Sequence, residues 1–258
     1  MILRRIAQHV RQQNWTAIGI DFVIVVVGVF LGIQLGNWNA ARAERDRERL
    51  LLSELRTELA ESVRQLQIKQ RAFQQVGRAG ERAIAFLDAG VDCGDDCWPV
   101  LVAFFHASQW QQVVVPRSTF DEMRRNGWPR DRDLLDALED YLRQADQLTP
   151  PLERPPAYRT LVRGLIPLAA HRPYWATCFE LTNGEEVYLD DCPAGVAPEV
   201  TAAAVAAIRA DPDLHRTLTE WAGFVGVFDV PLEGLITAAE RALALTDAEL
   251  GAANVPTR

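Results

Sequence analysis

The sequence predicts a mainly α-helical protein. We expect one N-terminal transmembrane helix that continues into a long amphipathic helix, followed by a helical-bundle domain with one small β-hairpin. Three observations support this prediction. Residues 17–38 are almost entirely apolar, residues 39–89 contain no proline and carry a stripe of apolar residues, and Asn183-Gly184 separates two short alternating segments.

The apolar segment is long enough to cross a membrane. Residues 22–33 contain only apolar residues and glycine, and a helix over residues 17–36 would extend about 30 Å, the thickness of a bilayer's hydrocarbon core. Trp15 and Trp38 bracket the segment, where indole rings prefer the membrane interface. We therefore predict a transmembrane helix at 17–38, with the lipid bilayer as its surroundings.

Two features of this helix are candidates for function. Gly28, Gly32 and Gly36 recur every four residues and form one face, along which another transmembrane helix, from a second copy or a partner protein, can approach closely. Asp21 lies seven residues before Gly28 and so nearly on the same face. It is either a hydrated interfacial carboxylate or an intramembrane carboxylate that pairs or carries protons.

The four cysteines fall into two close pairs, Cys93 with Cys97 and Cys178 with Cys192. Local pairs favour two disulfides in an oxidising compartment. Free thiols and a four-cysteine zinc site are the alternatives, although neither pair has the usual C-x2-C spacing.

The cysteines also favour one orientation in the membrane. Arginines flank the apolar segment in nearly equal number on both sides, so charge alone does not orient it. Disulfides place the large domain outside the cytosol. We therefore predict a bacterial inner-membrane protein with a basic cytoplasmic head at residues 1–16 and a periplasmic domain. A cleaved signal peptide, cut after Ala43, is the alternative.

Part of the sequence resembles an uncharacterised family of bacterial single-pass inner-membrane proteins. The stretch NWTAIGIDFVIVVVGVFLGIQLGNWNAARAER is similar to the family's opening, and STFDEMRRNG followed by DLLDALEDYL is similar to its second block. The similarity covers residues 1–60 well and residues 105–145 less well. It implies a membrane anchor with a mostly helical outer domain, and it implies no catalytic residues.

The remaining chain predicts the other elements. The amphipathic helix at 39–89 should bend near Gly77 and Gly80, and its stripe packs either on the protein's own domain or in an intermolecular coiled coil. The mainly helical domain follows at 90–258, with a possible sub-boundary at the prolines of 149–157. Its expected elements are helices at 99–111, 118–126 (N-capped by Ser118), from Asp131 or Asp133 to Leu148, 157–171, 198–210, 212–228 and 231–246, and a hairpin within 175–192.

Composition and motifs limit the function. The net charge of −8 argues against a nucleic-acid partner. The sequence has no phosphate-binding loop, HExxH or GxSxG motif, and His106 reads as a core or rim histidine. We expect no catalytic, cofactor or metal residues, and a protein that acts by binding or assembly. The alternatives are a coupling subunit of an ion-driven complex that uses Asp21, and a periplasmic ligand-sensing module.

Overall fold

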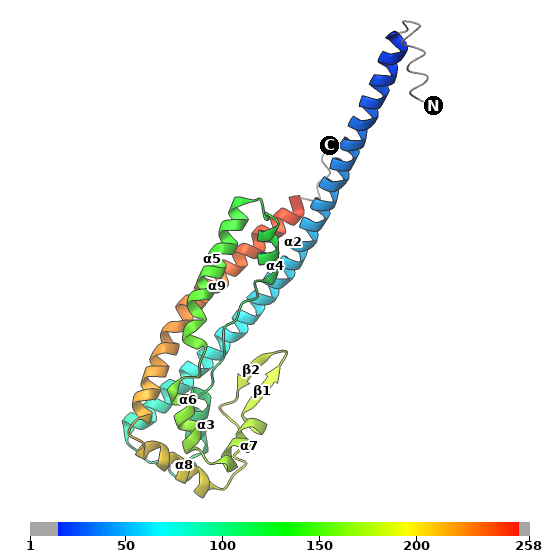
Figure 1. Ribbon diagram of the computed structural model, residues 1–258. Helices are drawn as coiled ribbons and strands as arrows, with labels where there is room; N and C mark the ends of the chain where they lie inside the picture. The colour runs from blue at the N-terminus through cyan, green and yellow to red at the C-terminus, as the bar shows by residue number, and fades with distance from the viewer. Residues whose placement is uncertain (1–14, 253–258) are drawn as a thin grey trace. The chain divides into compact units, whose positions relative to one another are not determined.

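The computed structural model describes residues 15–252 (Figure 1). It is mainly α-helical with one two-stranded antiparallel sheet, which confirms the predicted fold class and its long N-terminal helix. The elements are α2 (Trp15–Ala89), α3 (Trp98–Ala107), α4 (Ser118–Arg125), α5 (Arg132–Leu148), η1 (Pro150–Leu152), α6 (Ala157–Leu165), α7 (Leu168–Thr177), β1 (Phe179–Thr182), β2 (Glu185–Tyr188), α8 (Pro198–Ala210) and α9 (Leu214–Ala252).

The chain divides into two compact units, Met1–Leu52 and Ser53–Arg258. Helix α2 therefore begins in the first unit and ends in the second. The predicted boundary between residues 89 and 90 and the possible one at 149–157 both lie inside the second unit. The basic head falls outside the described residues except for its last two positions.

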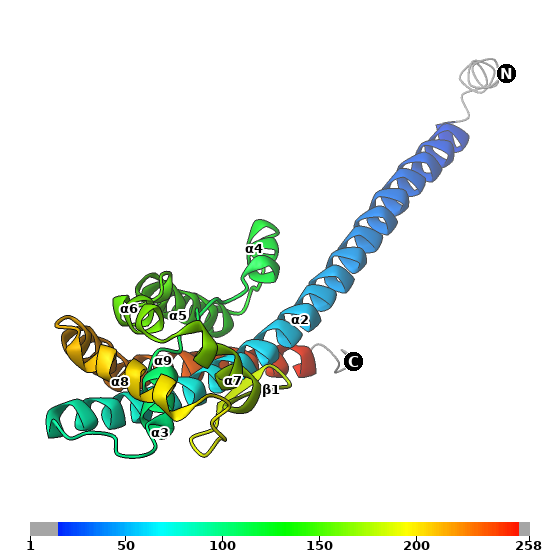
Figure 2. The ribbon, with the colours of Figure 1, turned by 90° about the horizontal axis from the view of Figure 1, so that it is seen from below.

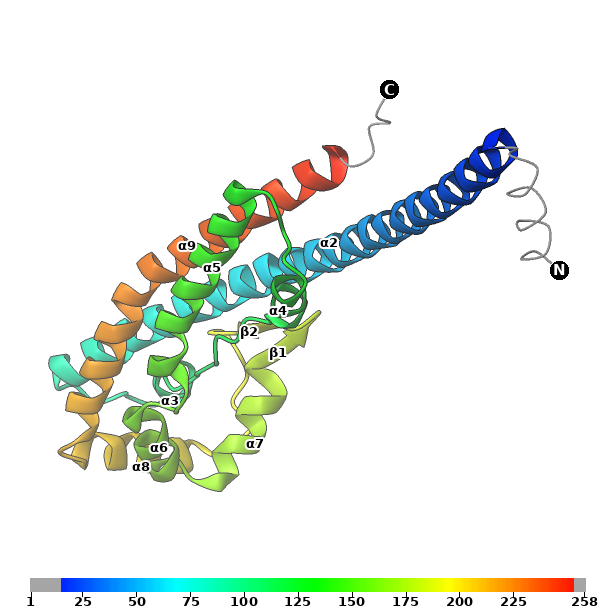
Figure 3. The ribbon, with the colours of Figure 1, turned by 45° about the horizontal axis from the view of Figure 1, so that its top comes forward.

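The second unit is built on two long antiparallel segments, residues 53–89 of α2 and helix α9, with α5 beside α9 (Figures 1 and 3). The apolar stripe of α2 is buried, and the ring of Phe73 meets that of Phe228 edge to face at 5.1 Å. Three glutamines of α2 also donate hydrogen bonds to carboxylates of α9: Gln67 to Glu240 (3.3 Å), Gln70 to Glu233 (2.7 Å) and Gln74 to Asp229 (3.1 Å). The stripe therefore packs on the protein's own domain.

Helix α2 is unbroken at Gly77 and Gly80, where a bend was expected. These glycines lie against α9. A Cβ atom at Gly80 would sit 3.1 Å from the Cβ of Ala222, and one at Gly77 would sit 3.5 Å from a methyl of Val225. The two glycines thus serve close helix packing, which offsets their low helix propensity.

Helix α9 is continuous, whereas separate helices at 212–228 and 231–246 were expected. Pro231 lies inside it. Proline lacks an N–H and disfavours a helix interior, but Phe228, Leu232 and Leu235 are all buried on one face across this point. Continuous packing on both sides of Pro231 therefore outweighs the local preference.

Proline has the opposite effect at residues 157–171, where one helix was expected and two form. Pro167 pushes the residue before it out of the helical region, and Ile166 has an extended backbone with ψ 124°. Helix α6 ends there, and α7 begins after the proline and continues to Thr177.

The predicted hairpin is confirmed. Strands β1 and β2 pair from Phe179↔Tyr188 to Thr182↔Glu185. Asn183 and Gly184 have φ of 53° and 82°, the left-handed pair that a two-residue hairpin turn requires.

Two cap predictions have different outcomes. Asp131 caps α5, because its carboxylate accepts a hydrogen bond from the Leu134 N–H at 2.8 Å. Ser118 was expected to cap α4, but it is the first helical residue of α4. Arg117 takes the cap position there, without a side-chain bond.

Helix α3 ends at Ala107, whereas the sequence predicted that it would continue to residue 111.

Candidate functional site

The first unit carries an apolar helical surface that no other part of residues 15–252 covers. Every large apolar side chain from Ile20 to Trp38 is 47–68% exposed. By length and composition this part of α2 is apolar enough to cross a membrane. Helix α9 passes the same test, but its apolar window is partly buried inside the second unit. Contiguous exposed apolar surface on this scale is unfavourable in water.

The residues singled out in this helix lie on its open surface. Among the residues that the structure describes, none lies within 4 Å of a Cβ atom built on Gly28, Gly32 or Gly36, so the glycine face is open there. Asp21 is also exposed. The guanidinium of Arg42 lies over the Trp38 ring at 5.9 Å from its centre. Trp15 is the first residue of α2.

The structure pairs the four cysteines as two local disulfides, Cys93–Cys97 and Cys178–Cys192. Cys178 follows α7 and Cys192 follows the hairpin, so this bond closes the open end of the hairpin. Both disulfides fit an oxidising compartment. No group of three His, Cys, Asp or Glu side chains within residues 15–252 is arranged to hold a metal ion.

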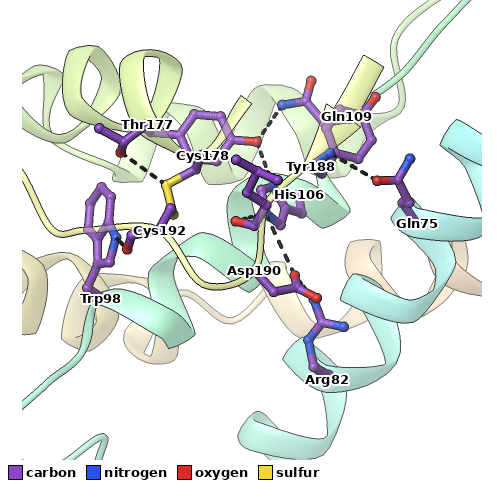
Figure 4. Close-up of polar contacts among 12 residues, drawn as sticks. Gln75, Arg82, Trp98, His106, Gln109, Thr177, Cys178, Tyr188, Asp190 and Cys192 are labelled. Carbon is purple, nitrogen blue, oxygen red and sulfur yellow. Dashed lines mark hydrogen bonds and ion pairs between the residues drawn. A yellow bond between two sulfur atoms is a disulfide. The ribbon is translucent and has the colours of Figure 1, made fainter. Parts of the chain in front are cut away.

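A chain of hydrogen bonds lies beside this disulfide (Figure 4). It joins α3, α6, α7 and the segment after β2. His106 is 1% exposed. Its Nδ1 lies 2.8 Å from the Tyr174 hydroxyl, and its Nε2 lies 3.1 Å from the Leu189 carbonyl oxygen. The Gln109 amide donates to the same hydroxyl at 2.8 Å, and Arg163 donates to the Gln109 oxygen at 2.9 Å.

The groups at the two ends of this series of hydrogen bonds determine which group donates in each bond. A carbonyl oxygen only accepts and a guanidinium only donates. Nε2 of His106 therefore carries the proton that bonds Leu189, Nδ1 accepts from Tyr174, and Tyr174 accepts from Gln109. When the imidazole is neutral, every group in this series has a hydrogen-bond partner of the required kind. A proton on Nδ1 would make the Tyr174 hydroxyl accept from both His106 and Gln109, which would leave the hydroxyl's own proton without an acceptor among the described residues.

Burial gives the same result for the charge of His106. It lowers the pKa of this histidine to about 4, more than the Leu189 carbonyl and the nearby Asp190 carboxylate raise it. Asp190 lies 3.8 Å from Nε2 but pairs with Arg82 of α2. A histidine that is buried, neutral and fully bonded acts as a structural group, in agreement with the expectation of a core histidine.

The partners of His106 were missed from sequence. Tyr174 is separated from it by 68 positions and Leu189 by 83. No spacing rule connects such residues. The one available signal was the concentration of Phe104, Phe105, His106 and Trp110 in a short apolar segment, which indicated burial but named no partner.

Comparison with protein-family models, curated proteins and solved structures finds no match for this chain. The family resemblance of residues 1–60 and 105–145 therefore stays a prediction.

Proposed function

We propose that the protein is anchored in the bacterial inner membrane by residues 17–38, and that it acts by binding or assembly rather than by catalysis. One observation carries the proposal: from Phe22 to Ile33 every residue is apolar or glycine, and the large side chains of this segment are exposed all around the helix. A helix that is apolar on all sides needs a non-aqueous environment.

In this proposal the head lies in the cytoplasm and the domain in the periplasm. The two disulfides support this orientation, because they persist in the periplasm and are rare in the cytosol. The arginines at both ends of the helix are compatible with either orientation.

Labelling of introduced cysteines tests the orientation. Gln8→Cys marks the head and Asp133→Cys marks the domain, while the four native cysteines stay blocked as disulfides. A membrane-impermeant maleimide applied to intact spheroplasts should label Asp133→Cys at once, and Gln8→Cys only after lysis. The reverse pattern would contradict the proposed orientation.

The open glycine face supports assembly through the membrane. Small residues let helix backbones approach closely in lipid, and nothing in the described chain covers Gly28, Gly32 or Gly36. Cross-linking of the full chain in its native membrane should capture either a second copy or another membrane protein.

The matched control lies on the opposite side of the helix, at Val26 and Phe30. The cross-link should be lost in Gly28→Leu/Gly32→Leu and kept in Val26→Leu/Phe30→Leu. Equal loss in both variants would show that the glycine face is not the contact.

A further inference from the structure

A polar pocket of about 550 Å³ opens in the second unit where three segments meet. Helix α2 contributes Lys69, the segment after α3 contributes Trp110, and strand β2 contributes Glu186. The hairpin lies beside α2 (Figure 2) and is bonded to it through Gln75.

Lys69 is the one lysine among the chain's 27 basic residues. It is half-buried, and burial lowers its pKa, opposed by the charge of Glu186. Within the described part of the chain, no carboxylate lies within 4 Å of its ammonium group, although Glu186 lines the same pocket. The pocket therefore holds a cation and an anion that are close enough to interact but do not pair.

Trp110, one of the residues that line the pocket, has an unsatisfied hydrogen-bond donor. Its indole Nε1 is buried and has no partner among the described residues. Two other buried tryptophans bond carbonyl oxygens: Trp98 donates to Cys192 at 2.9 Å and Trp221 donates to Ala107 at 2.8 Å. A buried donor without an acceptor is unfavourable, and a ligand oxygen in the pocket would supply one.

The charges near the pocket are mainly positive, although the whole chain is acidic. Arg159 and Arg163 are half-buried, and each interacts with the charge of Glu186. Neither guanidinium has a carboxylate within 4 Å in the part of the chain that the structure describes, because both bond Ser108 and Gln109 instead. Three cations therefore share one nearby carboxylate, which favours an anionic group in the ligand.

Glu186 gives the pocket a negative group as well. The Tyr188 hydroxyl donates to its Oε2 at 2.6 Å, which leaves Oε1 as an acceptor for a donor in the pocket. A dianion such as phosphate would be repelled by this carboxylate, whereas a molecule with separated charges satisfies both ends. We propose that the pocket binds a small zwitterion of the α-amino-acid class, with its carboxylate at Lys69 and the Trp110 N–H and its ammonium at Glu186.

The single lysine makes the test direct. Reductive methylation with ¹³C-formaldehyde keeps the charge of Lys69 and gives one side-chain amine signal in NMR spectra of the full chain in nanodiscs. Each of the twenty common L-α-amino acids is titrated alone, with succinate, which is only anionic, and ethanolamine, which is only cationic, as controls that carry charge of one sign. At least one amino acid should shift the Lys69 signal saturably with a dissociation constant of about 1 mM or tighter. Succinate and ethanolamine should bind at least about tenfold more weakly.

Variants of the charged groups test the assignment of the two ends. Glu186→Gln should weaken amino-acid binding about tenfold or more. Glu185→Gln is the matched control on the same strand, because Glu185 pairs with Arg71 outside this pocket, and it should leave binding unchanged. A flat titration with all twenty amino acids would overturn the proposal, as would succinate binding that equals amino-acid binding and ignores Glu186→Gln.

Trp110→Phe separates ligand binding from folding. It keeps an aromatic ring but removes an N–H that has no partner in the described protein, so it should weaken binding without lowering the unfolding midpoint. Trp98→Phe, which removes the bond to Cys192, should lower the midpoint. A destabilised Trp110→Phe with unchanged binding would contradict the assigned role of the indole.

Discussion

Helix α2 is one continuous element with two different surfaces. From Ile20 to Leu35 its apolar side chains point outward on every side and are exposed. From Ser53 to Ala89 they form one buried stripe, with Phe73 and Val76 only 3–4% exposed. The same residue types therefore serve opposite purposes in the two halves, and the pattern around the helix, rather than the hydrophobic content, distinguishes a surface for lipid from a surface for a protein core.

The largest expected difference between the halves comes from deleting the same side chain in each. Phe73→Ala removes a buried ring that contacts Phe228 and should lower the free energy of unfolding by about 3–5 kcal/mol. Phe30→Ala removes a ring that contacts no core and should leave unfolding of the second unit unchanged. Denaturant titration of the full chain in detergent micelles, followed by tryptophan fluorescence, measures both. Similar losses of stability in the two variants would contradict the distinction between the two halves of α2.

The next prediction concerns the protonation of His106, which lies in the second unit. Its pKa of about 4 lies below the ordinary 6.5, so the unfolded chain binds a proton in this interval and the folded chain does not. Stability should be full above pH 6.5 and fall as the pH drops toward 4, by about 3 kcal/mol in total.

Unfolding midpoints measured across this range test the assignment. His106→Gln keeps a polar side chain but cannot titrate, and it should flatten the decline between pH 6.5 and about 4.5, above the range where most carboxylates titrate. An unchanged slope in this variant would show that His106 is not the responsible group.

Glycine gives a smaller and more specific contrast. Gly80→Leu forces a large side chain against Ala222 and should cost about 1–3 kcal/mol of domain stability. Gly32→Leu enters open space and should cost none, but it should weaken association between membrane helices. If Gly32→Leu destabilised the domain, or Gly80→Leu did not, the assigned roles of the two glycines would be wrong.

The smallest expected effect is at Asp21. Because it is exposed near the start of the helix, Asp21→Asn should leave the unfolding midpoint unchanged and should complement a deletion strain at normal protein level. Failure to complement would instead favour the alternative of a coupling subunit that uses this carboxylate.

Local patterns predicted the features that depend on local physics. Asn183-Gly184 identified the hairpin turn, close spacing identified the disulfide pairs, and Asp131 identified a helix cap. Pro231 was misjudged because tertiary packing overrode a correct local preference. Gly77 and Gly80 were assigned a bend because their partner, α9, is more than a hundred residues away.

The polar groups of the second unit could not be paired from sequence. The glutamines of α2 look like ordinary solvated residues until α9 is placed beside them, and the chain from Arg163 to Leu189 requires three separate helices and a loop to converge. Nothing in the sequence pattern singles out Lys69. Only the fold shows that it shares a pocket with Trp110 and Glu186.

The most direct test of the central claim maps which helix contacts lipid. The full chain is placed in nanodiscs with a lipid-soluble photoactivatable diazirine, irradiated and digested, and the labelled peptides are identified by mass spectrometry. The label should be confined to residues 17–38 and absent from Leu214–Ala252, the other helix long and apolar enough to span a membrane. Label on α9, or none on residues 17–38, would contradict the assignment of the first half of α2 to the membrane.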